Sequence, residues 1–222
     1  MNSEYFLDYS LIAHYTRVMA INEIAVASDS VTDAILHAAM LRFEQYGYSK
    51  TTMSEIAGDC DMSAANIYRY FENKLEIGAQ LTMRCLAEER AALTSVIAEN
   101  ISAAVRLERF VLASLEHTFS RWSEKPRINE LVEAIAHERV DVVNAHVDAK
   151  RALLTQLIED GIRRGEFAVT DPVDSANAVH AATTLFSVPL YMQLKPYEEF
   201  QALAVSVANL MLGGLLSRSQ KK

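Results

Sequence analysis

The chain has 222 residues, half of them hydrophobic, with only seven glycines and four prolines. This composition argues against a disordered chain and supplies little of the turn chemistry that β-hairpins need, so helices should dominate. The formal net charge of −8 argues against a general nucleic-acid or anionic-membrane binder, because such proteins carry an excess of Lys and Arg.

A cytoplasmic protein is expected, without metal, cofactor or membrane partner. The two cysteines lack C-x-x-C spacing and are too few for a disulfide framework. Acidic residues stand where a secretory signal needs positive charge, and no stretch approaches the ~18 apolar residues of a membrane span. Residues 1–28 are interpreted as an N-terminal extension, either disordered or upstream of a true start at Met19, which mass spectrometry of the native N-terminus would test.

The first predicted helix spans about residues 31–46. Ile35, Ala39 and Phe43 recur at a spacing of four residues, which places them on one apolar face. Ser30 can cap the start of this helix, and Gly47 can end it in a left-handed conformation.

Two short helices are predicted next. Thr52 and Glu55 form a capping box, in which each side chain satisfies a free amide at a helix start. Gly58 weakens this second helix, and Asp61 can adopt the positive φ of a tight turn. Ser63 then serves as the N-cap of a third helix, so the three elements follow one another closely.

A long fourth helix should begin after the capping residue Asn73, and successive amphipathic helices should follow beyond residue 80. Breaks are predicted near Asn100, at Lys125-Pro126, at Gly161 and Gly165, at Asp171-Pro172 and between Pro189 and Pro196. The basic residues of "AAVRLERF" and "KRALLTQLIEDGIRRG" are interpreted as exposed faces because they alternate with acids at helical spacing.

The pair of short helices is typical of a DNA-reading helix-turn-helix, whose second helix enters the major groove with its N-terminus first. Ala64 and Ala65 permit close approach to thymine methyls, Asn66 can pair with adenine, and Arg69 can reach a guanine or a phosphate. Contacts with the phosphate backbone of the DNA are assigned to hydroxyl groups and to a charged side chain around the two helices. The candidate DNA-contacting residues are therefore Thr52, Ser54, Ser63, Ala64, Ala65, Asn66, Tyr68, Arg69, Tyr70 and Lys74.

The sequence is similar to the N-terminal domain of the TetR (tetracycline repressor-like) family of bacterial transcriptional regulators over "ILHAAMLRFEQYGYSKTTMSEIAGDCDMSAANIYRYFENKLEI". The Ile-Leu-x-Ala-Ala run, Gly47-Tyr48, Ile56-Ala57, Phe71 and Asn73-Lys74 fall where the family's pattern has them. The resemblance implies an operator-reading head at 29–76 and an all-α, ligand-sensing and dimerising domain at 77–222. It also implies a homodimeric regulator of double-stranded operator DNA that responds to a small-molecule effector.

Two departures from the family's pattern concern charge. Asp61 stands where the family commonly has Gly, and the segment before the first helix lacks the basic residues that relatives often have there. Residues 29–80 contain four basic and eight acidic side chains, so the reading domain is net acidic. We therefore expect modest and strongly salt-dependent DNA affinity.

Candidate residues in the larger domain are chosen by residue type and helical position. An effector cavity is mostly apolar with a few convergent polar groups, and its candidates are His117, Phe119, Trp122, His137 and Tyr191. Ordinary core packing is the alternative for each of them. The last two helices are the most apolar and are expected to form the dimer through Val179, Thr183, Phe186, Leu203, Val207 and Leu210.

The sequence thus predicts an all-α, non-enzymatic repressor that an effector releases from a palindromic operator, although the sign of regulation stays open. An enzyme or metal protein with a helical core would show paired carboxylate-histidine motifs or an activated nucleophile, and neither is visible. An all-α ligand-binding or interaction module without DNA binding is the other alternative, and the acidic reading domain favours it.

Overall fold

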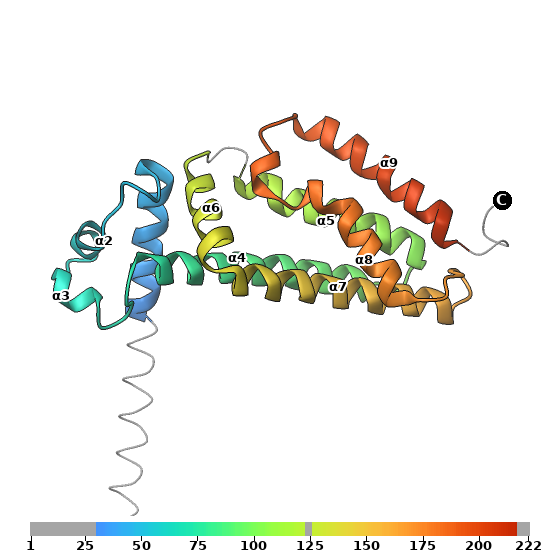
Figure 1. Ribbon diagram of the computed structural model, residues 1–222, viewed down its shortest axis with the longest axis horizontal. Coiled ribbons are helices and arrows are strands. Elements are labelled where there is room, and N and C mark those ends of the chain that lie inside the picture. Colours follow the sequence, from blue (N-terminus) through green and yellow to red (C-terminus); the bar gives the residue numbers. More distant parts are fainter. Residues whose placement is uncertain (1–29, 123–125, 217–222) are drawn as a thin grey trace, which may run out of the picture.

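The computed structural model describes residues 30–122 and 126–216 of the chain, and these residues are largely helical (Figure 1). A first helix covers residues 30–46. The elements after it are α2 (Met53–Asp59), α3 (Ala64–Ile67), α4 (Lys74–Ile97), α5 (Ala103–Trp122), η1 (Pro126–Ile128), α6 (Asn129–Glu138), α7 (Val140–Arg163), α8 (Pro172–Thr183), η2 (Thr184–Phe186), η3 (Pro189–Tyr191) and α9 (Tyr197–Leu215). The predicted all-α class is confirmed. The proposed extension at 1–28 lies outside the described residues.

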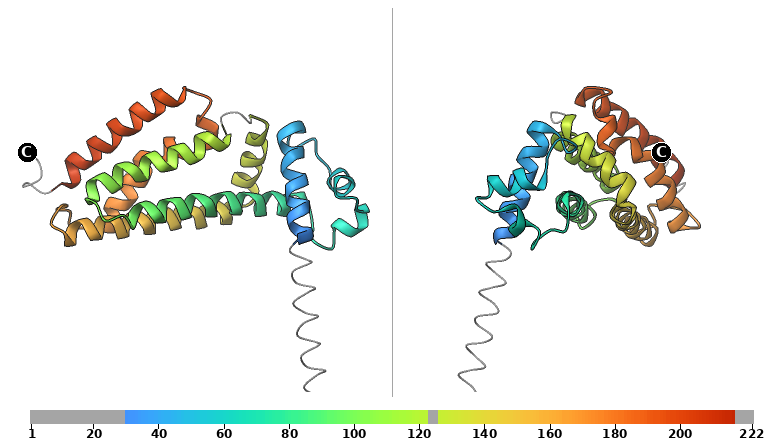
Figure 2. Two further views of the ribbon diagram at one scale, coloured as in Figure 1. Left: turned by 180° about the vertical axis from the view of Figure 1, so that it is seen from behind. Right: turned by 60° about the vertical axis from the view of Figure 1, so that its left-hand side comes forward.

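The molecule has a small head at one end and a larger helical body. The first helix, α2 and α3 form the head, and α4 leads from it into the body, where α7 lies alongside (Figures 1 and 2). Helix α8 packs on α7, and α9 packs on α5. Among the described residues, no helix combines the length and apolar character needed to cross a membrane.

Apart from Ser30, the predicted helix ends of the head are confirmed. Ser30 was predicted to cap the first helix, but it is itself a helical residue, so that prediction is wrong. Gly47 has a φ of +92°, and its amide donates to the Phe43 carbonyl at 3.0 Å. The Thr52 hydroxyl accepts from the Glu55 amide while the Glu55 carboxylate accepts from the Thr52 amide, which completes the capping box. Asp61 has a φ of +54°, the left-handed conformation that Asp tolerates in a tight turn. These local signals define the head because each depends on residues within one helical turn.

The hydrophobic core of the head continues into α6 and the start of α7. Ile35, Phe43, Ile56 and Ile67 are fully buried, and the same cluster includes residues from η1, α6 and α7. The added members are Ile128, Leu131, Ile135 and Val142. The head is therefore packed directly against the body rather than joined to it through α4 alone.

The predicted break at Gly161 is wrong, because α7 continues to Arg163. A Cβ at Gly161 would lie 2.3 Å from Cδ2 of Phe167, so glycine makes room for that ring. The helix is instead ended by Gly165, whose φ is +72°. Two interruptions were not predicted: Arg139 separates α6 from α7, and a 3₁₀ turn follows α8 at Thr184.

The interpretation of Arg106 as part of an exposed face is also wrong. Only 3% of this residue is exposed, and its guanidinium donates to the Ile97 carbonyl at 2.8 Å and pairs with Asp160. Arg106 thus ties α5 to the end of α4 and to α7. A carboxylate on a distant helix satisfies the buried charge, and periodicity along α5 carries no information about that partner.

Candidate nucleic-acid interface and internal cavity

Helix α3 projects from the head with its first turn uncovered. The Ser63 hydroxyl accepts from the Asn66 amide at 3.2 Å, and the Met62 amide donates to the Ala57 carbonyl at 2.9 Å across the turn. Ile67 is fully buried and anchors the helix in the head core. Ser63, Ala64 and Ala65 are exposed. The first turn of α3, with its small side chains, therefore faces outward, as major-groove recognition requires.

The candidate DNA contacts divide into exposed and half-buried residues. The exposed set is Thr52, Ser54, Ser63, Ala64, Ala65, Tyr68 and Arg69. Asn66, Tyr70 and Lys74 are half-buried, and Tyr70 packs against the head core. Tyr68 is 55% exposed, although it is a large aromatic residue. Five members of the exposed set lie on α3 or directly flank it, while Thr52 and Ser54 lie at the start of α2.

The ammonium group of Lys74 forms hydrogen bonds within the head. Its Nζ donates to the carbonyls of Tyr48 at 2.6 Å and Thr51 at 2.8 Å, and it lies 4.3 Å from the centroid of the Tyr48 ring. Burial lowers the pKa of Lys74, and the charges of Glu130 and Glu55 oppose that shift. Because its N–H groups donate to these carbonyls, Lys74 holds the loop between the first helix and α2 in place.

The excess of acids in the head is partly neutralised by arginines. Arg42 donates to Asp59 Oδ1 at 2.8 Å and lies 3.6 Å from a Glu55 oxygen. The hydrogen bond from Arg42 lowers the pKa of Asp59 most strongly. Arg84 pairs with Asp33 at 2.5 Å, and Arg139 with Glu76 at 2.8 Å. These acids are held in ion pairs, which weakens the argument that their charge prevents DNA binding.

A cavity of about 270 Å³ lies in the body between α4, α5, α6, α7 and α8. Much of its lining is apolar, from Leu86, Val132, Ile135, Val143, Val147 and Val188. Polar lining comes from Cys85, Glu89, His117, His146, Lys150 and His180, and from the hydroxyl residues Thr82, Thr118, Thr184 and Ser187. This volume lies just below the ~300–1,000 Å³ typical of ligand sites, so the cavity suits a small molecule.

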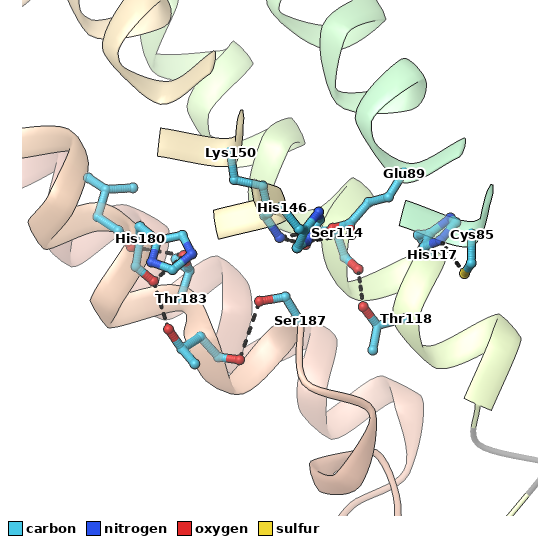
Figure 3. Close-up of polar contacts among 12 residues, drawn as sticks. Cys85, Glu89, Ser114, His117, Thr118, His146, Lys150, His180, Thr183 and Ser187 are labelled. Carbon is cyan, nitrogen blue, oxygen red and sulfur yellow. Dashed lines mark hydrogen bonds and ion pairs between the residues drawn. The ribbon is translucent and has the colours of Figure 1, made fainter. Parts of the chain in front are cut away.

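The polar wall centres on a buried ion pair (Figure 3). Lys150 Nζ donates to Glu89 Oε1 at 2.9 Å and to Ser114 Oγ at 2.6 Å, and the Ser114 hydroxyl donates to Glu89 Oε1 at 2.6 Å. His146 Nε2 lies 3.3 Å from Glu89 Oε2. Burial alone would raise the pKa of Glu89, but the His146 hydrogen bond and the Lys150 charge outweigh it and hold that pKa well below its usual range.

Two further histidines line the cavity. His117 Nε2 lies 3.4 Å from Cys85 Sγ, and burial raises the pKa of that thiol to about 11. Burial also lowers the pKa values of His117 and His180. At neutral pH both imidazoles are therefore uncharged, and Cys85 is a thiol rather than a reactive thiolate.

Of the four predicted cavity residues whose side chains the structure describes, only His117 lines this cavity. Phe119 packs edge-to-face against Tyr197 at 5.2 Å between ring centroids, in the core between α5 and α9. His137 is exposed on α6, and Tyr191 is 41% exposed. The Trp122 side chain lies outside the described residues.

The sequence interpretation missed Glu89, His146, Lys150 and His180. Lys150 was assigned to an exposed face, but it is only 5% exposed, so that interpretation is wrong. The available signal was the spacing of His146 and Lys150, which are four residues apart among apolar neighbours on one face of α7. Their carboxylate partner lies on α4, and sequence spacing alone could not identify it.

The candidate dimer residues occupy different faces of α8, η2 and α9. Val179 and Phe186 are buried in the core of the body, and the Thr183 hydroxyl donates to the Val179 carbonyl. Leu203 is 36% exposed and Leu210 is 79% exposed, while Val207 is half-buried. The outer faces of α8 and α9 carry many small exposed residues: Ala178, Ala181, Ala182, Ala202, Ser206, Gly213 and Gly214.

Helix α6 links the cavity to the head. Val132 and Ile135 line the cavity, and Leu131 and Ile135 belong to the head core. At the start of α6, Glu130 Oε2 accepts from the Ser49 amide at 2.8 Å and lies against Gly47. A displacement of α6 would thus act directly on the loop that precedes α2.

Comparisons with known proteins agree with this architecture. Residues 35–81 match the profile of bacterial regulatory proteins of the tetR family, and residues 103–207 match that of the tetracyclin repressor-like C-terminal domain. The HTH-type transcriptional regulator YhgD of Bacillus subtilis (strain 168), itself uncharacterized, is 26% identical over 146 residues, 62% of this chain and 72% of that protein.

Solved structures show the same fold. A transcriptional regulator from Cytophaga hutchinsonii superposes with a TM-score of 0.67 at 22% identity, covering 83% of this chain and 98% of that one. FadR from Bacillus subtilis in complex with stearoyl-CoA gives 0.62 at 18% identity, covering 82% and 97%. The head and the body are therefore both shared with these regulators.

Proposed function

The chain belongs to the tetR family of bacterial regulatory proteins and is a DNA-binding transcriptional regulator, and we propose that it is a cytoplasmic, homodimeric repressor released from its operator by a small molecule. The family is not normally enzymatic. The observation that carries the proposal is the uncovered first turn of α3, beginning at Ser63. Residues 29–76 are assigned to DNA reading, and residues 77–222 to effector binding and dimerisation.

The operator is proposed to be a rough palindrome. A symmetric dimer presents two copies of α3, which must be spaced by about 34–36 Å to enter successive major grooves on one face of B-DNA. The acidity of the head argues less strongly against this because Asp59, Asp33 and Glu76 are held by arginines. Affinity should nevertheless fall steeply with salt, since phosphate contacts release counterions.

Selection of bound genomic fragments by the full chain tests this proposal. At low salt we expect enrichment of fragments that share an inverted repeat, and loss of that enrichment in an Ala65→Glu variant. Ala65 is exposed on the first turn of α3, so the new carboxylate would face phosphates without disturbing the core. No enrichment at low salt, or equal enrichment by both proteins, would favour the interaction module without DNA binding.

The dimer is proposed to form through the outer faces of α8 and α9, where small side chains allow close helix approach. Leu210 is the most exposed large hydrophobic residue on α9, at 79%. We expect Leu210→Glu to raise the dimer dissociation constant by at least about 30-fold, because the carboxylate would be buried without a partner. Sedimentation equilibrium measures this change. Leu41→Glu, at a 52% exposed leucine of the first helix, is the matched control and should leave the dimer intact.

Release is proposed to be a two-state shift in which a molecule bound in the cavity moves α4 and α6 and reorients the heads. Support comes from Ile135, which lines the cavity and also belongs to the head core. Proteins of the same fold have been solved with small molecules bound: FadR of Bacillus subtilis in complex with stearoyl-CoA, and SmeT in complex with triclosan. Linkage requires that operator DNA weaken effector binding by the same factor, so equal effector affinity with and without operator would contradict the mechanism.

A further inference from the structure

Two polar groups on the cavity wall, Lys150 and His180, can still accept a partner. Lys150 carries three N–H donors, of which one contacts Glu89 and one contacts Ser114. Within the described part of the chain, neither the third donor nor the His180 ring has a hydrogen-bond partner, although both residues line the cavity. Because both groups line the cavity, a ligand that supplies an acceptor here would form hydrogen bonds with them.

The charge balance of the wall favours an anionic acceptor. Glu89 is the one carboxylate among the described lining residues, and Lys150, Ser114 and His146 already surround it. The other lining side chains that carry or can gain charge are Lys150, His117, His146 and His180, together with the Cys85 thiol. A ligand cation would therefore meet the Lys150 ammonium and a carboxylate that is already paired, whereas an anion can accept from Lys150 and from the His180 ring.

Resting on the function proposed above, we propose that the effector is a small apolar monocarboxylic acid, bound with its carboxylate at Lys150 and His180 and its hydrocarbon part in the apolar remainder of the cavity. The lining of Val132, Val143 and Val147 would cover that hydrocarbon part. The carboxylate would accept a charge-assisted hydrogen bond from Lys150 without separating it from Glu89.

Binding of the carboxylic acid should be coupled to the uptake of a proton by the His180 ring. In the free protein, burial lowers the pKa of His180 first, the nearby charges of Lys150, Arg151 and His146 lower it further, and Glu89 opposes them. A bound carboxylate would raise that pKa because opposite charge stabilises the imidazolium. Affinity for the acid should therefore weaken as the pH rises from 6 to 8, whereas affinity for a neutral analogue should not change.

The test uses three eight-carbon probes that differ in head group: octanoate, 1-octanol and octylamine. Calorimetry on the full chain at pH 6.5 should show octanoate binding about 10- to 100-fold more tightly than 1-octanol, and octylamine more weakly than either. Titrations in buffers of different ionisation enthalpy should show proton uptake with octanoate.

A His180→Leu variant separates recognition of the carboxylate from packing of the hydrocarbon chain. The leucine keeps the wall apolar but removes the ring donor and its charge. Octanoate affinity should fall at least about 10-fold and lose its pH dependence, while 1-octanol affinity stays within about 2-fold of the parent protein. His137→Leu is the matched control, because His137 is exposed on α6 and does not line this cavity.

The outcomes also separate this inference from the proposed function. Equal or tighter binding of 1-octanol or octylamine, absence of binding by all three probes, or unchanged octanoate affinity in His180→Leu would each overturn the acid assignment. Selection of operator DNA by the ligand-free protein is independent of these results. A chain that selects DNA but rejects octanoate would remain a regulator with a different effector class.

Discussion

Replacement of Arg69 by alanine is expected to weaken operator binding by about 10- to 100-fold, with almost no change in the stability of the head. Arg69 is exposed just beyond the end of α3, where its guanidinium can reach a guanine edge or a phosphate, and one good contact of this kind contributes about 1–3 kcal/mol. An exposed side chain without a packing role usually changes stability by less than about 0.5 kcal/mol. Fluorescence anisotropy with a selected operator measures the affinity, and thermal unfolding measures the stability.

Arg90 supplies the matched control for this substitution. It is also an exposed arginine, but it lies on α4 about 24 Å along the helix from Lys74. Arg90→Ala removes the same charge from the protein without altering the reading helix. Equal losses in the two variants would mean that net charge, rather than a local contact, governs binding. If Arg69 contacts a phosphate, its removal should also reduce the salt slope by about one.

The head could be predicted in detail because its determinants are local. The capping box of Thr52 and Glu55, the positive φ of Asp61 and the cap at Ser63 each depend on residues within one turn of each other. Their order along the chain sets the geometry of the helix-turn-helix. What local chemistry did not reveal is the role of Lys74, whose carbonyl acceptors lie 23 to 26 residues earlier.

The body was harder to predict because its polar groups are paired across helices. Lys150 and Arg106 follow the same spacing rules as exposed basic residues, and only their partners Glu89 and Asp160 explain their burial. Gly161 has the residue type of a helix end, yet it lies within α7 because Phe167 needs the space. Phe119, Trp122 and Tyr191 were chosen as cavity candidates for their aromatic rings, whereas the described cavity wall carries aliphatic residues and histidines, among which only His117 was a candidate.

Replacement of Lys150 by methionine is expected to destabilise the protein by about 3–5 kcal/mol, because it leaves the Glu89 carboxylate buried without its cation. Glu89 and Lys150 are 3% and 5% exposed, so solvent cannot compensate for the lost charge. The double variant Glu89→Gln with Lys150→Met removes both charges and should recover most of that stability. Urea unfolding at a fixed protein concentration measures the difference, since a dimer's apparent stability depends on concentration.

The pH dependence distinguishes a lost ion pair from a lost packing contact. In the parent protein the pKa of Glu89 is depressed, so its contribution is present above the unfolded-state value near 4.3 and is lost as the pH falls below it. In Lys150→Met the lysine charge no longer lowers the pKa of Glu89, while burial still raises it, so this pKa is higher than in the parent protein and protonation relieves the penalty at a higher pH. The gap between the two proteins should therefore narrow from pH 7.5 to pH 4. A gap that is independent of pH would assign the effect to packing, because the methylenes of Lys150 contribute equally at both pH values.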